Sequence, residues 1–386
     1  MKNTPALSHI VILLVSVLSL SGLAGCTRKS GDSANEVLVG EYGSFTGGEA
    51  TFGQSTSEGI KLAFSETNNA GGIRGKKLKL ITLDNQGKPE EARSSVQRLI
   101  TQDKVVAVLG EVASSRTLAA APVAQQYKVP MITPSSTNPK VTEVGDYIFR
   151  VCFIDPFQGL VMAKFARNEI KKSRVAILRD VKSDYSTGLA DVFTTEFKKM
   201  GGTIVADESY QAGETDFKAQ LTQIKGKKPD AIFVPGYYTE VGLIARQTRQ
   251  LGMTVPLLGG DGWDSEKLSE LGQDAIKGSY FSNHYTTEST EPVVVNFIKK
   301  YRETYSGKTP DGLAALGYDA AKILIAAMER TPDFASKNIR DEIAKTKNYV
   351  GVTGVITINE KRDATKSAVV VQVDGKVNRF VKTITP

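Results

Sequence analysis

Polar and aromatic side chains follow several short apolar runs of this 386-residue chain, and their types suit the binding of a small charged molecule. Hydroxyl groups both donate and accept hydrogen bonds, and a carboxylate binds a cation. In open α/β sheets ligands bind beyond the carboxyl ends of the strands, so the recurrence of this placement in both halves of the chain indicates a binding cleft. The residues so placed are Ser114, Ser135 to Thr137, Tyr185, Tyr237 and Asp261.

Residues 105–121 illustrate the arrangement. The apolar run 105–110 predicts a buried strand, and Ser114 and Ser115 take the N-cap position of the helix that follows. The free N–H groups of the first helical turn, together with a serine hydroxyl, would donate hydrogen bonds to a carboxylate. An ordinary N-cap between a strand and a helix accounts for the same residues.

The other residues also have structural alternatives. Ser135 and Thr137 lie among prolines and suit a turn, and Asp261 lies between two glycines. Tyr185 and Tyr237 suit packing at the edge of a core. Only the coincidence of all of them at strand ends favours a site.

The sequence lacks the motifs of the common catalytic and metal sites. It contains no CxxC, HExxH or EF-hand pattern, no Walker A loop, no GxSxG, and no GxGxxG after a strand. Its two histidines are His9, near the start, and His284. We therefore expect no metal site, no cofactor and no enzymatic reaction.

The charge distribution and the cysteine content further narrow the possible classes of function. The formal net charge of +7 is spread over 49 basic and 42 acidic residues without a basic block, which does not favour nucleic-acid binding. Cys26 and Cys152 are the only cysteines. With Cys26 modified as described next, Cys152 has no partner, and a buried thiol is expected.

The first 25 residues have the form of a secretory signal. Lys2 precedes an apolar run over residues 10–20, and Leu23-Ala24-Gly25-Cys26 follows. This form resembles a bacterial lipoprotein signal, which implies cleavage after residue 25, a lipid on Cys26 and a tether over residues 26–36. The alternative is an uncleaved membrane anchor, for which the apolar run is shorter than the roughly 20 residues of a membrane span.

From residue 37 onward, short β-branched runs alternate with helical windows. The first series runs to residue 153, with its first helix over residues 54–69, and a second series covers residues 174–259. Two amphipathic helices over 293–305 and 312–330 follow, then hairpin-type strands over 354–359 and 368–373 with turns at Asn359-Glu360 and Asp374-Gly375. This alternation predicts an α/β fold with two parallel sheets in two similar lobes.

Over nearly all of its mature length the sequence resembles the extracytoplasmic solute-binding proteins of branched-chain amino acid ABC transporters. The resemblance implies the type I periplasmic binding protein fold, with two Rossmann-like α/β lobes joined by a three-stranded hinge. Lobe 1 would comprise residues 37–154 and 284–366, and lobe 2 residues 155–283 and 367–386. The matching segments are Phe45-Thr46-Gly47, Phe52-Gly53, 69–77 (NAGGIRGKK), 131–137 (MITPSST), Asp184-Tyr185, Gly188, 236–240 (GYYTE) and 259–262 (GGDG).

The resemblance also implies how the ends of an amino acid would be held. Ser114 and Thr137 would bind the α-carboxylate. The α-ammonium group would meet Asp261, the hydroxyl of Thr137 and the carbonyl of Ser135, and Tyr185 would close over the ligand from the second lobe.

Three aromatic side chains would wall the side-chain pocket: Phe52, Tyr237 and Trp263. The sequence departs from the family pattern at Gly87 and Ala113, where some members place a disulfide. It also departs at Asp261 and Phe52, where some members carry Glu and Tyr. Because of these departures, the resemblance defines the class of ligand better than the individual ligand.

The resemblance implies an extracytoplasmic, lipid-anchored monomer, periplasmic or at the cell surface. It would capture an aliphatic or branched-chain L-amino acid by hinge closure and deliver it to an ABC permease. The alternative is a ligand sensor, or a binding protein for a different solute such as urea, an amide or an aromatic acid.

Overall fold

The computed structural model describes residues 35–375 and 377–386. The predicted signal, Cys26 and nearly all of the predicted tether lie outside the described residues.

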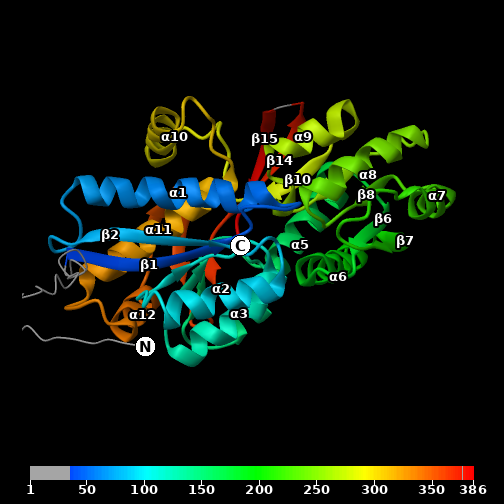
Figure 1. The fold of residues 1–386 in the computed structure, drawn as a ribbon. Coiled ribbons are helices and arrows are strands. Elements are labelled where there is room, and N and C mark those ends of the chain that lie inside the picture. Colours follow the sequence, from blue (N-terminus) through cyan, green and yellow to red (C-terminus); the bar gives the residue numbers. More distant parts are fainter. Residues whose placement is uncertain (1–34, 376) are drawn as a thin grey trace, which may run out of the picture. The chain divides into compact units, whose positions relative to one another are not determined.

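The first sheet has five strands, all parallel, in the order β2-β1-β3-β4-β5 (Figure 1). Its strands are β1 (Glu36–Gly43), β2 (Lys77–Asp84), β3 (Val108–Leu109), β4 (Met131–Thr133) and β5 (Ile148–Arg150). The connecting helices are α1 (Ala50–Asn69), α2 (Pro89–Thr101), α3 (Ser114–Tyr127) and the short α4 (Lys140–Glu143). Each helix returns the chain to the start of the next parallel strand.

The second sheet has seven strands in the order β15-β14-β10-β9-β8-β6-β7; β14 pairs antiparallel with both β10 and β15, and the other pairs are parallel. Its strands are β6 (Arg174–Asp180), β7 (Thr203–Tyr210), β8 (Ala231–Phe233), β9 (Leu257–Gly259), β10 (Tyr280–Asn283), β14 (Ala368–Asp374) and β15 (Val377–Ile384). Its helices are α5 (Asp155–Lys164), extended by a π-helix (Phe165–Glu169), α6 (Asp184–Lys199), α7 (Lys218–Gly226), α8 (Tyr238–Gln250) and α9 (Glu266–Gly272). Two short 3₁₀ helices cover Asp261–Trp263 and Gln273–Ile276.

A third group contains α10 (Pro292–Thr304), α11 (Gly312–Arg330), α12 (Ser336–Ala344) and a small sheet of β11 (Tyr349–Gly351), β12 (Gly354–Ile358) and β13 (Ala364–Thr365). The chain therefore crosses three times between the second sheet and the rest of the described fold: after β5, after β10, and between β13 and β14. Helices α1 and α11 lie side by side (Figure 1). Gly59 allows this close packing, because a Cβ there would lie 1.9 Å from the carbonyl oxygen of Ala314.

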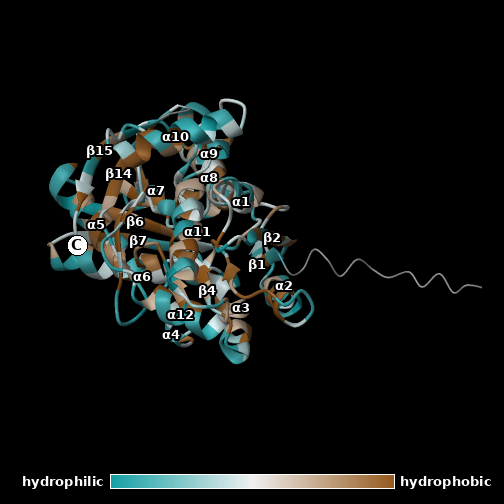
Figure 2. Ribbon diagram, turned by 90° about the vertical axis from the view of Figure 1, so that its left-hand side faces the viewer, coloured by the Kyte–Doolittle hydropathy of each residue, from teal (hydrophilic) through white to brown (hydrophobic). Residues whose placement is uncertain are grey.

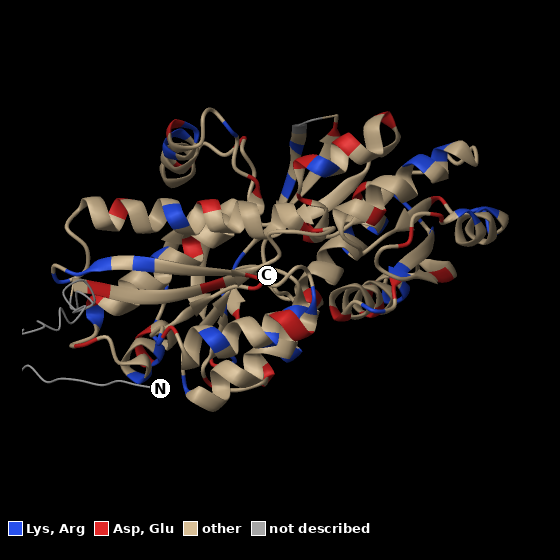
Figure 3. Ribbon diagram, in the orientation of Figure 1, with Lys and Arg blue, Asp and Glu red and all other residues tan. Residues whose placement is uncertain are grey.

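Burial explains the near-continuous apolar strands. All residues of β8 and β9 are buried, and Figure 2 shows brown concentrated in the strands, whereas α10 and α12 carry much teal. Figure 3 shows both signs of charge interspersed along the helices. Within the described part of the chain, no helix is long and apolar enough to cross a membrane.

The structure confirms the α/β class and the two series of parallel strands, with differences at three places. The strand expected over 105–110 is only Val108–Leu109, and it ends there because Gly110 has φ +119° and turns the chain. The first helix begins at Ala50, earlier than expected. The turns expected at Asn359-Glu360 and Asp374-Gly375 lie at the ends of β12 and β14, which pair antiparallel with β13 and β15; β15 itself lies outside the strand ranges expected from the sequence.

Candidate functional site

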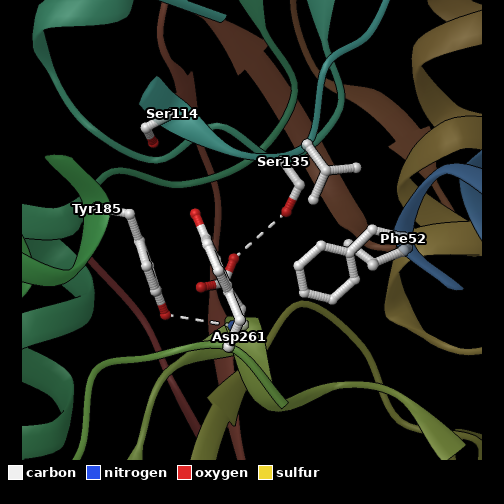
Figure 4. Close-up of a pocket in the computed structure, with 9 residues that line it drawn as sticks. Phe52, Ser114, Ser135, Tyr185 and Asp261 are labelled. Carbon is white, nitrogen blue, oxygen red and sulfur yellow. Dashed lines mark hydrogen bonds between the residues drawn. The ribbon is translucent and has the colours of Figure 1, made fainter. Parts of the chain in front are cut away.

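Side chains from both large sheets and their connections meet around one small cavity (Figure 4). The volume of this cavity, including its open mouth, is about 240 Å³. Six of the eight predicted ligand residues line it; the exceptions are Thr137 and Trp263. The lining residues are Phe52, Val112, Ser114, Ser135, Tyr185, Tyr237, Asp261, Gly262 and Leu313.

One end of the cavity is formed by the start of α3. Ser114 is the first residue of this helix and not its N-cap, so that expectation is wrong by one position; Ala113 is the N-cap residue. The Glu111 carboxylate accepts a hydrogen bond from the N–H of Ala113 at 2.7 Å and so takes the place of a capping side chain. The N–H groups of the first helical turn have no intrahelical acceptor and carry partial positive charge, so this end suits an anion.

A buried network holds this turn in place. Glu111, 1% exposed, accepts hydrogen bonds from Ser44 Oγ (2.7 Å), Asn85 Nδ2 (3.1 Å) and Arg116 Nε (2.9 Å). Arg116 also contacts Glu49, with Nη1 3.2 Å from Oε2. Side chains of the protein itself therefore hold the start of α3.

Asp261 lies at the opposite end of the cavity, two residues after the end of β9 (Figure 4). Its side chain is 5% exposed. Oδ1 accepts from Gln158 Nε2 at 2.8 Å, and Oδ2 lies 3.4 Å from Ser135 Oγ and 3.0 Å from His284 Nε2. Among the described residues no lysine or arginine forms an ion pair with Asp261, so its charge is available to a cation.

Aromatic rings form the walls. Tyr185 and Tyr237 stack with centroids 5.4 Å apart, and Phe52 meets Tyr237 edge-on at 5.4 Å. The Tyr185 hydroxyl accepts the N–H of Gly262 at 3.2 Å (Figure 4). Burial raises the pKa of Tyr185 well above its ordinary value, so this ring stays neutral. Val112 completes an apolar lining between the two polar ends.

The two predicted residues that do not line the cavity lie beside it. Thr137 is buried, and in the described part of the chain its Oγ1 has no hydrogen-bond partner. Its carbonyl accepts the N–H of Asp155 at 3.0 Å. Trp263 is fully buried: its indole Nε1 donates to the carbonyl of Val234 at 2.9 Å, so the expectation that it walls the pocket is not supported.

The sequence did not indicate two residues that contact Asp261. Gln158 lies in the middle of α5, and His284 follows β10. The isolated position of His284 was the only sequence signal for either of them.

Hydrogen bonds cross between the two sheet systems around the cavity. The Asp184 N–H donates to Ser115 Oγ at 2.9 Å, and its carbonyl accepts from Asn138 Nδ2 at 2.8 Å. Thr239 Oγ1 donates to the carbonyl of Gly48 at 2.7 Å. These bonds hold the cavity in a closed arrangement.

The arrangement suits a small molecule with an anionic group, a cationic group and an apolar part. The start of α3 would bind the anionic group and Asp261 the cationic group, and the apolar part would pack against the aromatic rings. No three histidine, cysteine, aspartate or glutamate side chains among the described residues are placed to hold a metal ion.

Comparison with known proteins agrees with this geometry. Residues 36–378 match a family described as periplasmic binding protein. An amino acid binding protein of Pseudomonas aeruginosa is 33% identical over 82% of this chain and 83% of its own.

Two solved structures share the fold and much of the sequence. A leucine-binding protein of Thermotoga maritima is 42% identical with a TM-score of 0.87, covering 91% of this chain and 99% of its own. A branched-chain amino acid transporter substrate-binding protein of Streptococcus pneumoniae, solved with isoleucine, is 35% identical with a TM-score of 0.86, covering 91% and 100%.

Proposed function

Because the chain belongs to the periplasmic binding protein family, we propose that it captures an aliphatic, branched-chain L-amino acid outside the cytoplasm and delivers it to an ABC permease. The observation that carries this proposal is the pairing of the α3 N-terminus with a buried carboxylate across one apolar cavity. The related proteins with leucine or isoleucine in their descriptions support the same ligand class.

The proposed pose follows from the two ends of the cavity. The α-carboxylate meets the first-turn N–H groups of α3 and Ser114, with Thr137 beside it. The α-ammonium group meets Asp261 and the carbonyl of Ser135, replacing the long 3.4 Å contact between these two residues.

The side chain of the ligand packs against the aromatic wall of Phe52 and Tyr237. Leucine has about nine heavy atoms, and at up to about 1.5 kcal/mol per atom micromolar affinity is within reach. One methylene is worth only about 1–3 kcal/mol, so several aliphatic amino acids should bind.

Capture uses closure of two lobes, residues 37–154 with 284–366 and residues 155–283 with 367–386. Hinge closure around a ligand is the established movement of periplasmic binding proteins. The bonds of Asp184 to Ser115 and Asn138 connect the proposed lobes and would form as they close. We propose that the protein works as a monomer, because the cavity is lined from a single chain.

A calorimetric ligand panel tests the ligand class. Leucine, isoleucine and valine should bind with overlapping affinities, and bound leucine should be recovered unchanged because no reaction takes place. Benzoate and urea should not bind measurably, since neither carries an ammonium group for Asp261. Tight binding of benzoate without binding of any L-amino acid would favour the alternative of a different solute.

We also propose that a lipid on Cys26 anchors the protein to a membrane after cleavage of residues 1–25. Cys26→Ser should release the protein from the membrane fraction and prevent incorporation of labelled fatty acid, because serine has no thiol to acylate. Cys152→Ser is the matched control and should leave the protein in the membrane fraction. Membrane retention and labelling of Cys26→Ser would contradict the anchor.

A further inference from the structure

The His284 imidazole lies against the carboxylate proposed to bind the ligand ammonium. Its Nε2 is 3.0 Å from Asp261 Oδ2, and its side chain is 1% exposed. Its ring stacks on Phe153, with centroids 3.8 Å apart and planes at 20°. Phe153 follows β5, and His284 follows β10, so this stacked pair belongs to two of the three chain passages to or from the second sheet.

Burial decides the charge state of the ring. Desolvation lowers the pKa of His284 to about 4, although the neighbouring Asp261 favours the cation. The ring is therefore neutral at pH 7 and carries one N–H. Nδ1 has no partner within the described residues, so the geometry favours the tautomer with the proton on Nε2.

A neutral donor suits a carboxylate that must bind a cation. An imidazolium would neutralise Asp261 and compete with the ligand ammonium group, whereas a neutral N–H fixes the carboxylate and leaves its negative charge. Gln158 acts in the same way on Oδ1, and its Nε2 also lies 3.0 Å from Ser282 Oγ. Both oxygens of Asp261 are thus held by uncharged donors.

We propose that His284 is the positioning residue for Asp261, donating its Nε2–H in a hydrogen bond so that the carboxylate stays aimed at the ligand ammonium group. The inference rests on the proposed function. It also connects ligand recognition with the hinge, because the ring that holds Asp261 is packed between two of the chain passages.

Other ionisable groups face this pair. Asp155, Cys152, Tyr185 and Asp264 face Asp261, and Lys366 faces His284. Burial raises the pKa of Asp155 to about 8 and that of Cys152 to about 12, and it lowers the pKa of Lys366 to about 8. These three pKa values lie above the range from pH 5.5 to 7.0. All five groups are present in the wild type and in both His284 variants compared below.

The test compares two variants at His284 by calorimetry with leucine at pH 7.0 and 5.5. His284→Phe keeps a ring for Phe153 but removes the N–H, and should weaken binding about tenfold to 100-fold at pH 7.0, the range for a hydrogen bond to a charged group. The affinity of the wild type should change less than twofold between pH 7.0 and 5.5.

His284→Gln places an amide N–H near the position of Nε2 and should recover most of the affinity. Binding of 4-methylpentanoate, which is leucine without its ammonium group, should not be weakened by His284→Phe. Equal weakening of both ligands, or equal loss in the Phe and Gln variants, would assign His284 to packing and overturn the inference. Failure of wild type to bind leucine would instead contradict the proposed function.

A spectroscopic measurement needs no change at the site. In the full chain with His9→Gln, His284 is the only histidine, so ¹⁵N-histidine labelling reports one ring. A neutral ring protonated at Nε2 at pH 5.5–7.0, whose Nε2–H resonance shifts on addition of leucine, is the expected result. An imidazolium, or a ring protonated at Nδ1, would overturn the inference.

Discussion

Asp261→Ala should weaken leucine binding by about 2–5 kcal/mol, at least 30-fold, when measured by calorimetry at pH 7. The loss is large because the ligand ammonium group would remain buried without a counter-charge. The carboxylate is 5% exposed and has no lysine or arginine partner among the described residues, so its charge is not used by an ion pair inside the protein.

Two controls separate charge from fold in this experiment. Asp261→Asn keeps the size of the side chain but removes its charge, and should lose most of the same affinity. Asp191→Ala removes a carboxylate that is 71% exposed and bonded to Arg179, and should bind leucine like the wild type. Wild-type affinity in Asp261→Ala would place the ammonium site elsewhere.

Glu111→Ala should lower the free energy of unfolding by about 3–5 kcal/mol, because Arg116 would lose its closest partner inside the protein. The hydroxyl of Ser44 and the amide of Asn85 would lose an acceptor as well. Urea unfolding followed by circular dichroism measures the change.

Glu196→Ala is the matched control for this substitution. Its partner is the largely exposed Lys199, 2.6 Å away on the same helix, and exposed pairs contribute about 0–1 kcal/mol. Equal destabilisation in the two variants would show that the Glu111 network does not hold the start of α3.

The sequence was sufficient to predict the layout of the fold because burial on both faces makes parallel strands read as apolar runs. Residues 231–233 and 257–259 are examples, and both are fully buried. β15 was not indicated because its sequence VNRFVKTI mixes charged and apolar residues, with Phe380 and Val381 exposed. Its place is set by antiparallel pairing with β14, which depends on the turn near Gly375.

Residues directly after strands could be predicted to share a cavity, because parallel strands bring their carboxyl ends to one edge. Ser114, Ser135 and Asp261 follow this rule. Trp263 does not, because two further residues in a 3₁₀ turn carry its indole back under β8, where it bonds to Val234.

Contacts between residues far apart along the chain could not be read from the sequence. His284 and Gln158 are 23 and 103 residues from Asp261 along the chain. They reach it because α5 and β10 belong to the same half of the fold as β9. Nothing in the local pattern around Gln158 distinguishes it from a polar residue on the surface of a helix.

The central claim is that one cavity holds both charged ends of an aliphatic amino acid, and one titration tests it most directly. Leucine added to the wild-type protein at pH 7 should bind with one site per chain and micromolar or tighter affinity. 4-Methylpentanoate and 3-methylbutylamine, which each lack one charged group, should bind at least 100-fold more weakly. Binding of either analogue as tightly as leucine, or no binding of leucine, would contradict the account.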